Sequence, residues 1–295
     1  MKNTVQYILI SIIIVLTACS TSSNKEATHE EGVAEVDHGS NIQNEIAEPQ
    51  SSNNATEVKV ETPSVEKKSA PVANTQYSRL NEALKQQNDE QIQKISSEIL
   101  TQNPKDPKAL NSLAMVYYKK GRFDAAEYLL NKAIASNPKV SELYGNYGVI
   151  QLAKNERRDG IKSFKKALEL NSQDYIAGAN LGSVYVQEKD YQKAVLALEI
   201  PFRKGTKDPK ILNNYAIALA ATGKTQEANE IYSKILKDNP SHRETLLNYS
   251  ILLIDELKKN KEGLDLLNRL KFVGPPQESN EIIKDLENKA KAGLQ

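Results

Sequence analysis

The sequence is poor in the residues that metal and redox chemistry need. Its 295 residues include one cysteine, three histidines, two methionines and no tryptophan. A single cysteine forms no intrachain disulfide and no thiolate cluster, and no two of the histidines, His29, His38 and His242, stand at metal-ligand spacing. We therefore expect no enzyme activity, no cofactor and no metal site.

Long hydrophobic runs are also missing. The longest apolar segment covers ten residues, from Tyr7 to Leu16, and is interrupted only by Ser11. A membrane-spanning helix needs about 20 such residues. A short polar start with Lys2, followed by an apolar segment of this length, is instead typical of a signal peptide.

The only cysteine follows this apolar segment directly, in Leu16-Thr17-Ala18-Cys19. These four residues resemble the lipobox of bacterial lipoproteins. The resemblance implies cleavage before Cys19 and attachment of acyl chains, palmitate among them, which together give a stable membrane anchor. Ser20 is similar to the residue found in lipoproteins sorted to the outer membrane, which implies a location at its periplasmic face. The alternative is an ordinary cleaved signal peptide in which Cys19 is incidental.

The composition changes after Cys19. Residues 20–74 contain almost no large apolar side chains and carry four basic against ten acidic ones, a net charge of −6. Such a segment cannot build a core, so we predict a disordered tether. The expected organisation is a signal peptide over 1–18, a lipidated tether over 19–74 and a folded domain over 75–295.

The folded domain repeats one pattern every 34 residues. In the unit that begins at Pro107 the pattern comprises Leu110, Leu113, Ala114, Tyr117, Gly121, Ala126, Leu130, Ala133 and Pro138. This pattern resembles the tetratricopeptide repeat, and it recurs in units that begin near residues 73, 107, 141, 175, 209 and 243. A pair of short amphipathic helices cannot bury its apolar stripes alone, so each pair has to stack on the next.

The resemblance implies an all-α fold, a right-handed superhelix of about six helix pairs. Three features depart from a regular array. The sixth unit fits the pattern only with one extra residue. Pro201 stands inside an expected helix, which should end near Ile200 and leave 202–208 as a loop. After Pro275 and Pro276, residues 279–292 predict a capping helix, with Ser279 as its N-cap and Gly293 as its stop.

In the tetratricopeptide family the first helix of each pair lines the concave surface. One inward position of this surface is asparagine in four consecutive units: Asn146, Asn180, Asn214 and Asn248. An amide both donates and accepts, so this row could hold the backbone of an extended partner. The alternative is that the asparagines serve packing or hydration.

Other inward positions are mainly apolar: Met115, Tyr118, Val149, Leu152, Val186, Ile217, Ile251 and Ile254. The family's carboxylate clamp needs a lysine and an asparagine at positions where this chain has other residues. We therefore expect a protein or peptide partner with apolar anchors. The alternative is that the capping helix or the curvature of the array covers this surface.

Residues 75–295 carry a net charge of only +6, with their basic runs mostly on second helices, so we expect no nucleic-acid partner. The combined resemblance implies a non-catalytic, membrane-anchored interaction scaffold in the bacterial envelope. It is similar to tetratricopeptide lipoproteins of type IV pilus secretins and tight-adherence systems, and a secretin or pilus component is the expected partner. The alternative is an adaptor for cell-wall hydrolases or periplasmic proteases. The partner, the oligomeric state and the envelope type stay open at this point.

Overall fold

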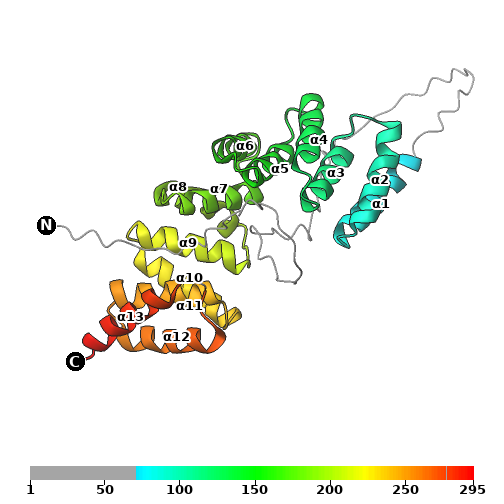
Figure 1. The fold of residues 1–295 in the computed structure, drawn as a ribbon. Helices are drawn as coiled ribbons and strands as arrows, with labels where there is room; N and C mark the ends of the chain where they lie inside the picture. The colour runs from blue at the N-terminus through cyan, green and yellow to red at the C-terminus, as the bar shows by residue number, and fades with distance from the viewer. Residues whose placement is uncertain (1–70, 277) are drawn as a thin grey trace, which may run out of the picture. The chain divides into compact units, whose positions relative to one another are not determined.

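The computed structural model describes residues 71–276 and 278–295, and within them it contains helices and no strand. The predicted signal peptide, Cys19 and nearly all of the predicted tether lie outside the described residues. The described chain forms two compact regions, 71–138 and 139–295. Each region is built from pairs of helices joined by short turns, coloured cyan to green and green to red in Figure 1.

The region 71–138 contains two helix pairs. These are α1 (Pro71–Lys85) with α2 (Asp89–Gln102), and α3 (Pro107–Lys119) with α4 (Phe123–Ser136). Four residues that stand 34 residues before pattern positions of the next unit are buried in its core: Leu80, Ala83, Ile92 and Ile99. The first helix begins at Pro71, four residues before the expected domain boundary at residue 75.

The region 139–295 contains four helix pairs and a final single helix. They are α5 (Ser141–Ala153), α6 (Arg157–Leu170), α7 (Tyr175–Gln187), α8 (Tyr191–Arg203), α9 (Pro209–Ala221), α10 (Thr225–Asp238), α11 (Arg243–Ile251) with a π turn η1 (Leu252–Glu256), α12 (Asn260–Val273) and α13 (Asn280–Ala292). The expected all-α class, the helix pairs and the capping helix are confirmed.

Aspartates fix the start of several first helices. The side chains of Asp106, Asp174 and Asp208 each accept a hydrogen bond from a backbone N–H in the first turn of the helix that follows. Such a cap contributes about 1 kcal/mol. Pro107 and Pro209 add a preset backbone angle at the first helical position. Local sequence therefore helps to set where these first helices begin.

Small residues let the two helices of a pair approach closely. A Cβ atom added at Gly148 would lie 2.8 Å from the ring of Phe164, and one added at Gly182 would lie 2.3 Å from Leu198 Cγ. Phe164 and Leu198 have no exposed surface at all. The large residue of the second helix therefore fills the space that the missing side chain of the first helix leaves.

The extra residue of the sixth unit is accommodated as the π turn. The backbone N–H of Leu257 donates to the carbonyl of Leu252 at 3.0 Å, five residues back instead of four. Lys258, the next residue, has φ +56° and stands where the turns of the other units have their left-handed residue. The insertion is thus absorbed before the turn, and the second helix keeps its place.

Pro201 does not end its helix at the expected point. Helix α8 continues to Arg203, and the loop is limited to 204–208. Proline removes only the hydrogen bond to the carbonyl of Ala197, because the last turn is otherwise closed by bonds from Lys204 to Ile200 and from Thr206 to Pro201. A Cβ atom at Gly178 would lie 2.9 Å from that Ala197 oxygen, so the neighbouring helix leaves room for it.

The capping helix covers the last apolar face as expected. Ile283, Leu286 and Ala290 of α13 are buried against Leu267 and Leu270 of α12. Ser279 stands at the N-cap position, but the expected side-chain cap is wrong, since its hydroxyl donates to the carbonyl of Pro276 at 2.6 Å. The helix ends at Ala292, directly before Gly293.

The left-handed turn residues generate a stability prediction. Gly223 has φ +84°, whereas Lys189 occupies the same position of its unit with φ +59°. A side chain in this conformation costs about 1 kcal/mol. We expect Lys189→Gly to raise the free energy of unfolding by about that amount and Gly223→Ala to lower it, as measured by urea denaturation followed by circular dichroism. The two substitutions should change the free energy of unfolding in opposite directions. A loss of stability in Lys189→Gly would contradict the assignment.

Candidate interaction surface

The apolar residues of the predicted groove fall into three groups. Met115 and Tyr118 lie on α3 in the region 71–138, half-buried, and the Tyr118 ring contacts Phe123 with centroids 5.8 Å apart. The remaining residues lie in the region 139–295. There they are divided between two hydrophobic clusters, so they do not form one uninterrupted row.

The first cluster joins α5, α7 and α9. Val186 and Ile217 are buried in it, and Val149 and Leu152 pack against it from α5. Three consecutive first helices therefore bring four of the predicted apolar groove residues together. This arrangement follows from the 34-residue period, which places equivalent positions of successive units side by side.

The second cluster contains Ile251 at the end of α11 and Ile254 in η1. Ile254 is 3% exposed, and its Cγ1 atom would lie 2.4 Å from a Cβ atom at Gly263 of α12. It packs between the two helices of its own pair and contributes to the core. Leu152, at the same position of its own unit, likewise packs toward its second helix, 3.0 Å from a Cβ atom at Gly160.

The asparagine row serves different roles at its four positions. Asn214 Nδ2 donates to Ser183 Oγ at 3.1 Å, and Asn248 Nδ2 donates to Asn213 Oδ1 at 3.3 Å. Both bonds join one first helix to the preceding one. For Asn214 and Asn248, the alternative that the asparagines serve packing between repeats therefore holds. Their partners Ser183 and Asn213 lie at neighbouring inward positions and were not among the predicted groove residues.

Asn180 differs from Asn214 and Asn248. Its Nδ2 atom is buried and has no hydrogen-bond partner among the described residues. An unpaired buried donor costs about 1–3 kcal/mol, which a bound acceptor would recover. Asn146 is also buried, at 5% exposed. Within the row, Asn180 thus has a buried Nδ2 donor with no partner in the described part of the chain.

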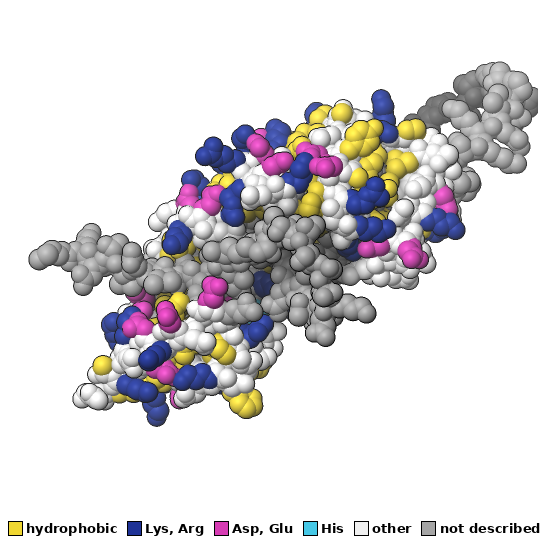
Figure 2. Space-filling view, in the orientation of Figure 1, with side chains coloured by type: hydrophobic (Ala, Val, Ile, Leu, Met, Phe, Trp, Pro, Cys, Tyr) yellow, Lys and Arg dark blue, Asp and Glu magenta, His cyan; other side chains and the backbone are white. Residues whose placement is uncertain are grey.

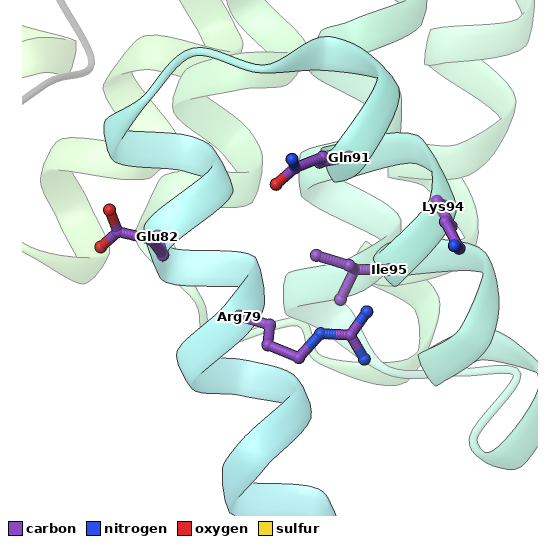
Figure 3. Close-up of a pocket in the computed structure, with 5 residues that line it drawn as sticks. All are labelled: Arg79, Glu82, Gln91, Lys94 and Ile95. Atoms are coloured by element: carbon purple, nitrogen blue, oxygen red, sulfur yellow. The ribbon is translucent and has the colours of Figure 1, made fainter.

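A separate hollow of about 300 Å³ lies between α1 and α2. Figure 3 shows Arg79 of α1 extending toward α2, where Gln91 and Ile95 point back toward α1, whereas Glu82 points away from α2 and Lys94 lies on the side of α2 away from α1. Arg79 also pairs with Glu98 at 3.2 Å. None of the predicted groove residues lines this hollow. Its mixed charges favour no single ligand sign.

The described surface carries charges of both signs. On the face drawn in Figure 2, Lys and Arg side chains are interspersed with Asp and Glu.

Within residues 71–276 and 278–295 no group of three or more His, Cys, Asp or Glu side chains could hold a metal ion. The same part of the chain has no helix both long enough and apolar enough to cross a membrane.

Two family models of the tetratricopeptide repeat match the chain, one over residues 83–147 and the other over 148–200. Among curated proteins, the chain is 26% identical over 184 residues to the anaphase-promoting complex subunit CDC16 of Saccharomyces cerevisiae. It is 21% identical over 152 residues to a TPR repeat-containing protein of Dictyostelium discoideum. These matches cover 56% and 49% of this chain, and only 22% and 58% of the two relatives.

Solved structures share the fold. YrrB, described as a TPR protein with an unusual peptide-binding site, superposes with a TM-score of 0.57 at 16% identity, over 65% of this chain and 97% of that one. PilF of Pseudomonas aeruginosa superposes with a TM-score of 0.51 at 18% identity, over 63% of this chain and 88% of that one. At such identities the likeness concerns the fold alone.

The two roles of the asparagines can be separated by stability. We expect Asn214→Ala to lower the free energy of unfolding by about 1 kcal/mol, because it removes the bond to Ser183. Asn180→Ala removes no such bond and takes away an unpaired buried donor, so it should not lower the midpoint of urea unfolding. Equal losses in the two variants would contradict the distinction.

Residues 83–200 thus carry tetratricopeptide repeats recognised by family models, and solved structures of such repeats share the fold. The repeat implies a scaffold for protein–protein interaction, a type that is not typically catalytic.

Proposed function

We propose that this protein is a membrane-anchored scaffold of the bacterial envelope that binds a polypeptide partner along the first helices of its repeats. The observation that carries the binding role is the Asn180 Nδ2 atom, which has no hydrogen-bond partner among the described residues. Two predicted groove residues of the preceding first helix, Val149 and Leu152, remain partly exposed at the edge of the first cluster, which buries Val186 and Ile217. A partner with apolar anchors and a free backbone carbonyl matches this chemistry, because main-chain hydrogen bonds and side-chain pockets are how extended peptides are recognised.

The anchoring role is supported by the sequence before the described residues. Cys19 follows an apolar segment of ten residues, and the Leu-Thr-Ala-Cys pattern resembles a lipobox. Acidic residues outnumber basic ones by six in 20–74, so the segment would be repelled from acidic headgroups. Under this proposal the lipid holds the protein at the outer membrane while the repeats face the periplasm.

The finer assignment is assembly of a pilus or secretion system, with a secretin or pilus component as the partner. It rests on the resemblance to pilus-associated tetratricopeptide lipoproteins, and the shared fold with PilF agrees with it. The long segment before the first helix departs from compact proteins of that kind. Identification of the bound partner therefore tests this assignment.

The lipid anchor has a direct test. Cells that express the wild-type protein and receive radiolabelled palmitate should incorporate label into it, because Cys19 supplies the thiol that the acyl-bearing group needs. Cys19→Ala should lose the label and leave the membrane fraction. Ser20→Ala is the matched control and should retain both. Equal labelling of Cys19→Ala would remove the anchor from the proposal.

The binding role is tested at the unpaired amide. Partners crosslinked in intact envelopes should be recovered less with Asn180→Ala, by roughly fivefold to tenfold, since one hydrogen bond to a buried donor is lost. Asn288→Ala, an exposed asparagine on α13, is the matched control and should recover wild-type amounts. Recovery of a secretin or pilus component supports the finer assignment, and recovery of cell-wall hydrolases instead would contradict it. Wild-type recovery with Asn180→Ala would contradict the binding site.

A further inference from the structure

The start of α11 is capped by an imidazole. His242 is the N-cap residue, and its Nδ1 atom accepts a hydrogen bond from the backbone N–H of Thr245 at 3.3 Å. Helices α7, α8 and α9 have aspartates in this role, Asp174, Asp190 and Asp208. Carboxylates stay ionised near neutral pH, whereas imidazole changes charge between pH 5 and 8. Among residues 71–276 and 278–295, His242 is the only histidine.

The cap is linked to a different helix through a buried polar network. His242 Nδ1 lies 2.8 Å from Thr245 Oγ1, which lies 3.1 Å from Asn213 Oδ1 on α9. Asn248 Nδ2 donates to the same Asn213 oxygen at 3.3 Å. Thr245, Asn213 and Asn248 are all buried, and His242 has only 14% of its side chain exposed. The network joins α11 to α9 at the junction of two repeats.

The cap hydrogen bond requires one protonation state of the ring. Thr245 N–H donates to Nδ1, so this bond needs an unprotonated Nδ1 and a ring proton on Nε2, whereas the Thr245 hydroxyl, whose own proton goes to Asn213, accepts only from a protonated Nδ1. Nε2 then points toward Glu244, whose Oε2 atom is 3.5 Å away. Protonation of Nδ1 removes the acceptor, leaves the Thr245 N–H without its cap and places a positive charge at a helix N-terminus, where the helix dipole opposes it.

Charged groups from two elements surround the ring. Burial has the largest effect and lowers the pKa of His242 from its usual 6.5. Glu244 of α11 and Asp208 at the start of α9 raise this pKa, while Lys210 of α9 and Arg243 of α11 lower it. From α12, Arg269 reaches the carbonyl of Pro240, in the loop before His242.

We propose that His242 is a proton-sensitive N-cap of α11, placed at the junction with α9. At neutral pH the uncharged ring accepts the Thr245 N–H and caps the helix. Since the folded state holds the ring proton less tightly than the unfolded chain does, the stabilisation is present above about pH 6.5 and is lost as the pH falls. Acid therefore weakens the first turn of α11.

The test is hydrogen exchange on the full chain at pH 7.5 and 5.5, corrected for the intrinsic pH dependence of amide exchange. In the wild type, protection of amides in 243–251 should fall by about fivefold at the lower pH, which is the size of a lost cap. His242→Asn keeps a capping oxygen that does not titrate, so its protection should be the same at both values. His242→Ala should show low protection at both.

Two results would overturn the proposal. One is equal loss of protection at pH 5.5 in the wild type and in His242→Asn. The other is an imidazole titration midpoint at or above 6.5, measured by nuclear magnetic resonance on the same protein. Both measurements are independent of any partner, so failure of the proposed envelope function would not affect the proposal for this N-cap.

Discussion

The close approach of the two helices within a pair is the constraint on which the rest of the structure depends. Gly182 leaves no side chain where Leu198 packs, and Gly148 does the same for the ring of Phe164. Leu198 and Phe164 are thereby buried completely, and each Å² of apolar surface removed from water stabilises the fold by about 25 cal/mol. Stacking of pair on pair then aligns equivalent positions of the first helices, and the interaction surface is a consequence of that alignment.

Three features of the region 139–295 show how the array tolerates departures from the repeat. The π turn absorbs one extra residue, Pro201 costs one hydrogen bond in a last turn, and α13 covers an apolar face that no further repeat covers. Among the predicted apolar groove residues of this region, Val186, Ile217 and Ile254 are buried, whereas Val149, Leu152 and Ile251 are partly exposed.

The sequence was sufficient to predict the helix pairs, because the 34-residue period directly reports which side chains are buried. It was also sufficient to place the extra residue in the sixth unit. It could not predict that α8 continues past Pro201, since this depends on room near Gly178 and on bonds across the last turn. The sequence also could not predict the hydrogen bonds of Asn214 and Asn248, because their partners Ser183 and Asn213 belong to the preceding repeats, 31 and 35 residues away in the chain.

A double-mutant cycle at Gly182 and Leu198 tests the central claim most directly. The free energy of unfolding would be measured for the wild type, Gly182→Ala, Leu198→Ala and the double variant. Gly182→Ala should cost about 1–3 kcal/mol in the wild type, because the added Cβ atom overlaps Leu198. In the Leu198→Ala background the Gly182→Ala substitution should cost little or become favourable, since the Leu198 side chain no longer fills the space beside residue 182. The same cost in both backgrounds would contradict the account.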